Sequence, residues 1–312
     1  LRESSNNIIW GNSITDNRLG GIYLHRYSSY NSISGNNISN YGGGVLLTES
    51  SNNSVSGNNI INNQYREGVF LEKSFNNSIS YNNISNNYLG VYLWCSEYNN
   101  LVKNNITENN KYGISLYASS NNLIEQNDIT HNEVGIYFQG MWANEHNSFY
   151  HNNFIANSQQ VYIEVYGYAN VWDDGYPSGG NYWSNYTGID LFNGPNQNET
   201  GSDGVGDINY VIDENNRDLY PLMSLFAACD AGTWNEEKYN INVVSNSTVS
   251  KFRVNKTERI ISFNVTGEAG LGFCRVTIPN VIVQDLWQGN YSVLINGQPT
   301  EFRNWTDDTN TY

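Results

Sequence analysis

A sequence motif centred on asparagine recurs through the first half of the chain and constrains the fold more than any other feature. Each copy runs from an Asn through two aliphatic positions and a second Asn to a Gly-aliphatic-Tyr-aliphatic ending. The opening Asn occurs seven times, at intervals of 22 to 25 residues: Asn7, Asn31, Asn53, Asn77, Asn99, Asn122 and Asn147. A period this short, with no helical pattern inside it, predicts a solenoid of stacked coils.

Aligning the copies gives four apolar columns. Two are Ile9, Ile33, Val55, Ile79, Leu101, Ile124, Phe149 and Ile14, Ile38, Ile60, Ile84, Ile106, Ile129, Phe154; the others are Ile22, Val45, Val69, Val91, Ile114, Ile136, Val161 and Leu24, Leu47, Leu71, Leu93, Leu116, Phe138, Ile163. Inward and outward positions alternate within segments of three to five residues, which predicts short strands. β-branched residues suit such a half-buried pleated surface.

Glycine and asparagine also form columns. Six glycines precede the third apolar column, where we expect positive φ or a close backbone approach: Gly21, Gly44, Gly68, Gly90, Gly113 and Gly135. Gln160 takes the glycine's place in the seventh copy, so the solenoid is expected to end there. The asparagines are expected to form turns and to bond from coil to coil in ladders along the axis.

Coils such as NNSVSGNNI, NNSISYNNI and GVYLWCSEYNN resemble the right-handed parallel β-helix repeats of the NosD-type family. The segment 171–222, with WDDGYPSGGNYWSNYTG and GSDGVGDINYVIDENNRDLYPL, resembles the piece that closes such helices in archaeal surface proteins. Together the two segments cover about two thirds of the chain. The resemblance implies the fold, and the family label mentions copper and sugars. It specifies fold better than activity.

The chain is therefore expected to be all-β, with three parts. Residues 1–165 form a parallel β-helix of about seven coils, roughly 34 Å long. Residues 166–225 form a closing segment, and residues 226–312 form a small antiparallel, Ig-like β-sandwich. Both ends of the sequence look cut, so the first coil is expected to expose unpaired backbone groups that a neighbouring subunit could cover.

Composition indicates a protein that works outside the cell. A net charge of −15 argues against binding to nucleic acid or to an anionic membrane, and no apolar run is long enough to span a membrane. Asn-x-Ser/Thr sequons are dense, which predicts N-linked glycans on a secreted, archaeal-like cell-surface protein. The sequons begin at Asn37, Asn52, Asn76, Asn83, Asn105, Asn185, Asn198, Asn246, Asn255, Asn264, Asn290 and Asn304.

The chain has three cysteines, an odd number for a secreted protein. Cys229 and Cys274 fall in the last domain and are predicted to form a disulfide. Cys95 follows Trp94 within a coil and is expected to be packed there.

Two kinds of metal site are suggested by the sequence. The acidic, glycine-containing segment after residue 200 resembles the calcium loops of surface proteins, in which carboxylate oxygens wrap a hard cation. The candidate ligands are Asp203, Asp207, Asp213 and Asp218, with Asp190 as a fifth. Copper would require histidine and methionine, and His131, Met141, His146 and His151 lie near the last coils; we expect these to be loop residues.

A column of outward-pointing aromatic residues lies between the two columns of the longest strand. Its members are Tyr23, Phe70, Tyr92, Tyr137 and Tyr162. Three interpretations stay open: rings that cover the sheet, a subunit interface, or a surface that stacks on sugar rings.

A β-helix enzyme needs carboxylates gathered on one lateral face, and the outward positions do not supply that cluster. Glu49 and Glu72 are plausible neighbours, but Lys73 accompanies them. The sequence therefore predicts a structural protein without enzymatic activity, which assembles with copies of itself into a surface layer, sheath or filament. The alternatives are a module that binds surface polysaccharide and a polysaccharide lyase or hydrolase.

Overall fold

The computed structural model describes residues 1–140, 142–165, 167–267 and 272–312. The chain divides into two compact units. The first comprises Leu1–Thr200 and Val205–Leu222, and the second comprises Gly201–Gly204 and Met223–Tyr312. Met141 lies outside the described residues.

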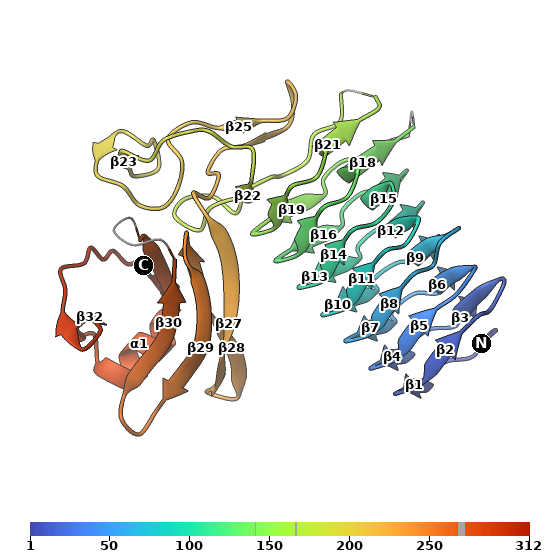
Figure 1. Cartoon of the computed structure of the whole chain (residues 1–312), viewed down its shortest axis with the longest axis horizontal. Coiled ribbons are helices and arrows are strands. Elements are labelled where there is room, and N and C mark those ends of the chain that lie inside the picture. Colours follow the sequence, from blue (N-terminus) through green and yellow to red (C-terminus); the bar gives the residue numbers. More distant parts are fainter. Residues whose placement is uncertain (141, 166, 268–271) are drawn as a thin grey trace. The chain divides into compact units, whose positions relative to one another are not determined.

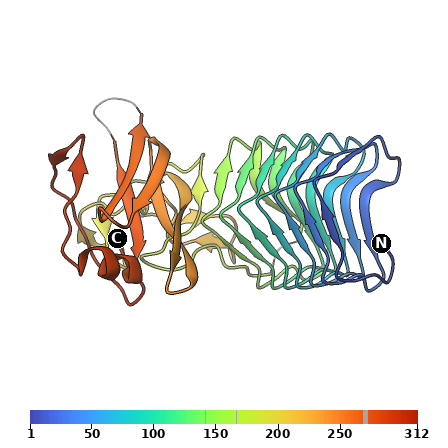
Figure 2. The same cartoon turned by 90° about the horizontal axis from the view of Figure 1, so that it is seen from below.

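The first unit is a parallel β-helix of about seven coils, which confirms the predicted fold (Figure 1). Each coil contributes one strand to each of three parallel sheets. Sheet A holds the longest strands: β3 (Gly20–His25), β6 (Gly43–Thr48), β9 (Glu67–Glu72), β12 (Leu89–Trp94), β15 (Tyr112–Tyr117), β18 (Val134–Gln139) and β21 (Gln159–Ile163). Figure 2 shows the coils edge-on, stacked from the N-terminal end.

Sheets B and C are built from strands of three residues, apart from a final two-residue strand. Sheet B contains β1 (Ile8–Trp10), β4 (Ser32–Ser34), β7 (Ser54–Ser56), β10 (Ser78–Ser80), β13 (Asn100–Val102), β16 (Leu123–Glu125) and β19 (Ser148–Tyr150). Sheet C contains β2 (Ser13–Thr15), β5 (Asn37–Ser39), β8 (Asn59–Ile61), β11 (Asn83–Ser85), β14 (Asn105–Thr107), β17 (Asp128–Thr130), β20 (Asn153–Ile155) and β22 (Tyr182–Trp183).

The four apolar columns of the sequence form the core in register. Ile9 pairs with Ile33, Ile22 with Val45, and the same correspondence continues from coil to coil. The column residues of coils two to six are almost fully buried. The hydrophobic periodicity therefore fixes both the strands and their pairing, because a one-residue slip would turn these side chains to solvent.

Asparagine side chains bond from coil to coil in three ladders at the corners inside the helix. In the second ladder, the Oδ1 of each Asn accepts both the backbone N–H and the side-chain amide of its counterpart in the preceding coil, at 2.9–3.0 Å. The predicted amide ladder is confirmed. Its members are Asn12, Asn36, Asn58, Asn82, Asn104, Asn127, Asn152 and Asn181.

The closing segment ends these ladders with polar acceptors. The N–H of Asn170 donates to Asn216 at 3.0 Å, and the N–H of Asn181 donates to the Asp218 carboxylate at 2.8 Å. The third ladder ends where Asn157 donates to the side chain of Gln160, the residue at which the repeat was expected to stop.

Aromatic rings close the end of the apolar core. Trp172 stacks on Phe149 at 4.4 Å between ring centroids, and Trp183 stacks on Phe154 at 4.2 Å. Tyr210 stacks on the other side of Trp183, also at 4.2 Å. Its strand, β25 (Tyr210–Val211), pairs with β26 (Arg217–Asp218), and a second short hairpin joins β23 (Phe192–Asn193) to β24 (Glu199–Thr200). The segment therefore acts as a cap for the last coil.

The glycine column is required by close packing of the backbone and not by positive φ. A Cβ at Gly90 would lie 2.4 Å from the carbonyl oxygen of Gly113, and one at Gly44 would lie 2.3 Å from that of Gly68. Both distances are shorter than any real Cβ contact. Of the two reasons expected from the sequence, the structure selects the close approach.

The second unit is built from small antiparallel sheets and one helix. A four-stranded sheet has the order β27 (Leu225–Trp234), β28 (Glu237–Ser245), β31 (Cys274–Pro279) and β34 (Asn310–Thr311). Two hairpins pair β29 (Thr248–Asn255) with β30 (Ile260–Thr266) and β32 (Leu294–Ile295) with β33 (Gln298–Pro299). The helix α1 (Asn280–Trp287) buries Ile282 and Leu286 and was not predicted.

The predicted disulfide between Cys229 and Cys274 is wrong, because the two sulfurs are not bonded. Strands β27 and β31 flank β28 on opposite sides. Cys229 is opposite Ile241, whereas Cys274 is opposite Ser245, four residues farther along β28. The two cysteines are thus separated by about 10 Å across the sheet and about 13 Å along it, and a disulfide needs Cα atoms within about 7 Å.

Removal of a rung from the buried ladder should destabilise the first unit strongly. Asn104→Ala leaves the N–H of Asn82 and the carbonyl of Ile79 without their side-chain partners, so we expect a loss of about 2–4 kcal/mol in the free energy of unfolding. Asn105→Ala is the matched control, because Asn105 belongs to an exposed row on sheet C and should cost less than about 1 kcal/mol. Urea unfolding measures both. Equal losses would show that the buried ladder is not a special source of stability.

Gly90→Ala should also destabilise the first unit, by about 1–3 kcal/mol, because the new methyl group meets the Gly113 carbonyl. Gly57→Asn is the control. Gly57 has a φ of 62° with open space around it, and Asn accepts that backbone conformation. Thermal unfolding of both variants checks the prediction, and a Gly90→Ala midpoint equal to that of the control would contradict it.

Candidate functional site

The outer face of sheet A is the surface on which side chains with binding chemistry gather. Three rows of residues face away from the core along the seven strands, which lie side by side from β3 to β21 in Figure 1. The rows are Gly20, Gly43, Glu67, Leu89, Tyr112, Val134, Gln159; Tyr23, Leu46, Phe70, Tyr92, Ser115, Tyr137, Tyr162; and His25, Thr48, Glu72, Trp94, Tyr117, Gln139, Glu164.

Aromatic rings contact one another along this face. Tyr137 stacks on Tyr112 at 4.2 Å between centroids and on Tyr162 at 5.6 Å. Trp94 and Tyr117 pack edge to face, with 6.1 Å between their ring centroids. Tyr162 is 42% exposed and Trp94 is 41% exposed, so each presents ring surface to solvent. The face is therefore an apolar strip with several accessible rings.

The middle of the strip has a gap in its aromatic row. Ser115 stands between Tyr92 and Tyr137 in the row, and the hydroxyl of Tyr92 donates to Gln139 at 3.1 Å, two coils away. Ser115 is only 1% exposed, yet its Oγ has no hydrogen-bond partner among the residues that the structure describes. At this gap the row therefore has the small buried hydroxyl of Ser115 between the rings of Tyr92 and Tyr137.

Three carboxylates accompany the rings. Glu72 accepts from the Thr48 hydroxyl at 3.3 Å, and Glu164 accepts from the Gly140 N–H at 2.6 Å. Burial, with the nearby charge of Glu67, raises the pKa of Tyr92 to about 12, so this phenol stays protonated at neutral pH. The face thus offers hydrogen-bond acceptors and protonated phenols together.

The predicted aromatic column lies on this face, as expected. Tyr23, Phe70, Tyr92, Tyr137 and Tyr162 all occupy its middle row. The sequence analysis assigned no role to three further rings, at Tyr112, Trp94 and Tyr117, or to Glu67. Trp94 and Tyr117 directly follow the fourth apolar column, so the two-residue alternation places them on the outer face. Glu67 and Tyr112 would be placed inside by the same alternation; they face outward because the glycine that follows each of them also faces the core.

The five aspartates predicted to bind calcium do not form a metal site in the described parts of the chain. Among the residues described, no group of three or more His, Cys, Asp or Glu side chains could hold a metal ion. The Asp207 carboxylate accepts the N–H groups of Leu191 and Phe192, and Asp213 accepts those of Asn215 and Asn216. These carboxylates therefore hold loops in place.

The remaining candidates are Asp203, Asp190 and Asp218. Asp203 belongs to the second unit, whereas Asp190 belongs to the first. Asp218 is fully buried and accepts N–H bonds from Asn181 and Trp183 at 2.8 Å and from Tyr220 at 3.1 Å. It ends an asparagine ladder, a role that the sequence analysis did not foresee.

The histidines near the last coils lie in three different turns. His131 follows β17, His146 precedes β19 and His151 joins β19 to β20, each with φ between 55° and 57°. The Nε2 of His151 lies 3.3 Å from the Ser178 hydroxyl, which donates in turn to Asp174 at 2.7 Å. Because the hydroxyl lies between the imidazole and the carboxylate, this is not the order of a nucleophilic triad.

The sequon asparagines are accessible. All of the twelve except Asn83, which is half-buried, are exposed. Asn83 and Asn105 belong to a row of bonded amides on the outer face of sheet C. N-glycosylation stays a prediction that the exposure of these side chains allows.

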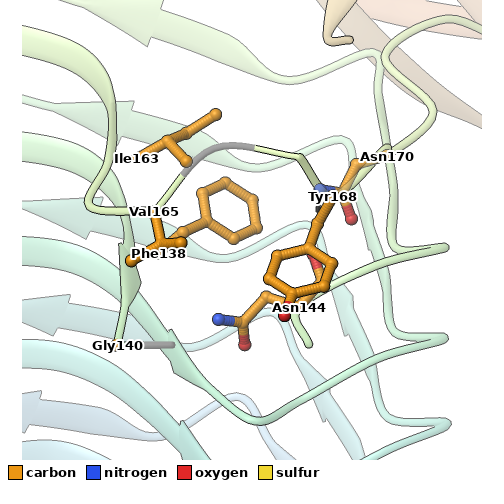
Figure 3. Close-up of a pocket in the computed structure, with 7 residues that line it drawn as sticks. All are labelled: Phe138, Gly140, Asn144, Ile163, Val165, Tyr168 and Asn170. Carbon is orange, nitrogen blue, oxygen red and sulfur yellow. Dashed lines mark hydrogen bonds between the residues drawn. The ribbon is translucent and has the colours of Figure 1, made fainter. Parts of the chain in front are cut away.

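A small hollow lies beside the last strands of sheet A (Figure 3). It is lined by Phe138, Gly140, Asn144, Ile163, Val165, Tyr168 and Asn170. Its volume of about 10 Å³ is about that of one water-sized sphere. The hollow is too small for a sugar residue, so the candidate site is the open face of sheet A.

Comparison with known families gives one match. The family described as "Periplasmic copper-binding protein (NosD)" matches residues 1–114 and 64–188. No curated protein matches the sequence. Copper has no fitting ligand set in the described parts of the chain, because the histidines are dispersed over separate turns.

Solved structures share the fold. A variant of the periplasmic alginate epimerase AlgG has a TM-score of 0.50 and 22% identity, over 55% of this chain and 44% of that one. The A-module of the Azotobacter vinelandii mannuronan C-5 epimerase AlgE6 has a TM-score of 0.45 and 18% identity, over 54% and 53%. The chain thus spans less than half of the alginate epimerase, and the likeness is one of fold.

The prediction that the chain is not an enzyme is corrected by this comparison. The alginate epimerase that shares the fold is an enzyme named for its action on a polysaccharide, so a β-helix of this kind does not argue against enzymatic activity. The prediction rested on a search for paired carboxylates around Glu49 and Glu72. It overlooked the acids and phenols that sheet A places in its other outward rows.

The buried carboxyl of Asp218 should make stability depend on pH. Burial raises its pKa to about 7 in the folded protein, against about 3.9 in the unfolded chain. Its contribution is therefore fully present below about pH 4 and is lost as the pH rises through 7. Between pH 5 and 7.5, the urea midpoint of the natural protein should fall relative to that of Asp218→Asn, which cannot titrate. Parallel pH profiles for the two proteins would contradict this assignment.

Proposed function

Because the chain belongs to the NosD family of parallel β-helix proteins, we propose that it is a polysaccharide-binding protein that acts outside the cytoplasm. The outer face of sheet A is its binding surface. The single observation that carries the proposal is the aromatic strip on that face, with rings accessible from Tyr23 at one end to Tyr162 at the other.

The geometry of the strip suits an extended chain of sugars. Successive strands repeat at about 4.8 Å, so one ring or polar group recurs at each step along the axis. Aromatic rings pack against the apolar faces of pyranose rings, while the carboxylates and phenols between them accept and donate hydrogen bonds to hydroxyl groups. An open face that crosses seven coils accommodates a polymer better than a single sugar.

The comparisons support the same class of ligand and the same side of the membrane. The family is described as periplasmic, and the alginate epimerase with the same fold is periplasmic and acts on a polysaccharide. No helix in the described parts of the chain is long and apolar enough to cross a membrane.

Other predictions from the sequence remain proposals. Self-assembly into a layer, sheath or filament, bound calcium, N-linked glycans and a place on an archaeal cell surface are each open to test. None has a supporting contact within the described residues. The aromatic strip therefore favours polysaccharide binding as the first function to test.

Loss of accessible rings should weaken glycan binding. Trp94→Ala and Tyr162→Ala each remove a partly exposed ring from the strip, and each should lower affinity by about tenfold. Tyr81→Ala is the matched control, because Tyr81 is 62% exposed but lies in the turn between sheets B and C. Glycan arrays find the ligands, and isothermal titration gives the affinities.

The same samples show whether the bound oligosaccharide is chemically converted. New reducing ends or an altered uronate composition after incubation would reveal turnover, and the variants would show whether the strip is involved. The proposal fails if no oligosaccharide binds, or if Tyr81→Ala weakens binding as much as Trp94→Ala.

A further inference from the structure

The outer face of sheet A has one sign of charge. Its three rows contain three glutamates, Glu67, Glu72 and Glu164, and no lysine or arginine. The bases adjacent to the rows in sequence lie in the turns on either side of the strands: Arg66 and Lys111 precede β9 and β15, and Arg26 and Lys73 follow β3 and β9. The chain as a whole carries a net charge of −15. A ligand that lies along the strip therefore meets carboxylates without a cation among them.

Glu67 is the most informative of these acids. It begins strand β9 and is half-buried, and its Oε2 is buried without a hydrogen-bond partner in the described parts of the chain. Glu67 is also close enough to Tyr92 for its charge to act on that phenol. A buried carboxylate oxygen that accepts no bond is costly, and a hydroxyl or ammonium group of a ligand would supply the missing donor.

Ser115 gives a second, independent observation on the same face. Its hydroxyl is buried and unpartnered among the residues described, and it lies in the gap of the aromatic row. The rings of the row continue on both sides of this gap, at Tyr92 and Tyr137. Two buried polar groups that lack partners, set within an aromatic strip, mark the part of the face where a ligand would form directed hydrogen bonds.

We propose that this part of the face selects glycans that lack carboxylates, with Glu67 and Ser115 as specificity-determining residues. The inference rests on the proposed function. A neutral or amino-sugar chain offers only donors and hydroxyl groups to Glu67, whereas a polyuronate brings a carboxylate at every sugar and meets like charge. The ligand class thus differs from the alginate of the structural neighbour, even though the fold is shared.

Three hexasaccharides test this selection by isothermal titration: one of β-linked glucose, one of β-linked glucosamine and one of mannuronate. At low salt, the glucose or the glucosamine chain should bind at least about tenfold more tightly than the mannuronate chain. The difference should shrink at high salt, because screening weakens the repulsion.

Glu67→Gln keeps the shape and removes the charge, so it should reduce this discrimination about three- to tenfold. Glu108→Gln is the matched control, since Glu108 is exposed in the turn before sheet A and should leave the ratio unchanged. Ser115→Ala should weaken the glucose chain without improving the mannuronate chain.

The outcomes separate the two proposals. If the mannuronate chain binds as tightly as the others and Trp94→Ala weakens it, the charge selection is wrong and the polysaccharide-binding face stands. An unchanged ratio in Glu67→Gln would likewise overturn the role of Glu67. If none of the three binds and the glycan array is also negative, both proposals fail.

Discussion

The coil-to-coil hydrogen bonds of buried asparagines are the interaction on which the rest of the structure depends. Each tight corner of a coil turns backbone groups toward an interior that excludes water. The asparagine side chain accepts a backbone N–H and an amide N–H from the preceding coil, and it donates to a carbonyl, as Asn104 does to Ile79. Three corners per coil are satisfied in this way, so three short strands can follow one another without helices or long loops.

A ladder of this kind needs an end, and the closing segment provides it. Asn216 and Asp218 take the place of the next asparagine in two ladders, while Gln160 does so in the third. The same segment covers the apolar core with Trp172 and Trp183. Polar and apolar endings are therefore supplied by one stretch of chain, in which Asp207, Asp213 and Asp218 accept backbone N–H groups.

The rigid register has a consequence for function. Because every coil repeats the same path, outward side chains of sheet A stand in straight rows at strand spacing. The aromatic strip needs no separate architecture; it requires only that residues such as Tyr137 and Tyr162 occupy one position of the repeat. A polymer that extends along the axis meets an equally extended surface.

Much of this could be predicted from the sequence, since periodicity reports directly on a repeated coil. The apolar columns and the amide ladders follow from spacing alone. The ending at Gln160 was also visible, because that residue replaces a glycine whose Cβ has no room. The middle row of aromatic residues was found for the same reason. Glu67 was overlooked because strict alternation from Val69 and Leu71 places it inside, whereas the inward-facing Gly68 breaks the alternation.

Features that depend on contacts outside the repeat could not be predicted from the sequence. Asp218 looks like a calcium ligand, because a buried acceptor and a metal loop use the same acidic and glycine residues. The helix α1 was missed because a short apolar run such as VIV suits a strand equally well. The disulfide was predicted because both cysteines fall in the last domain, but strand order in the second unit sets Cys229 and Cys274 apart.

The most direct test of the central claim is a crystal structure of the protein with its tightest-binding oligosaccharide. The account predicts sugar density along the outer face of sheet A, with pyranose rings over Trp94 and Tyr162 and a ligand donor at the Oε2 of Glu67. Density on the outer face of sheet B or sheet C, or in the second unit, would contradict it.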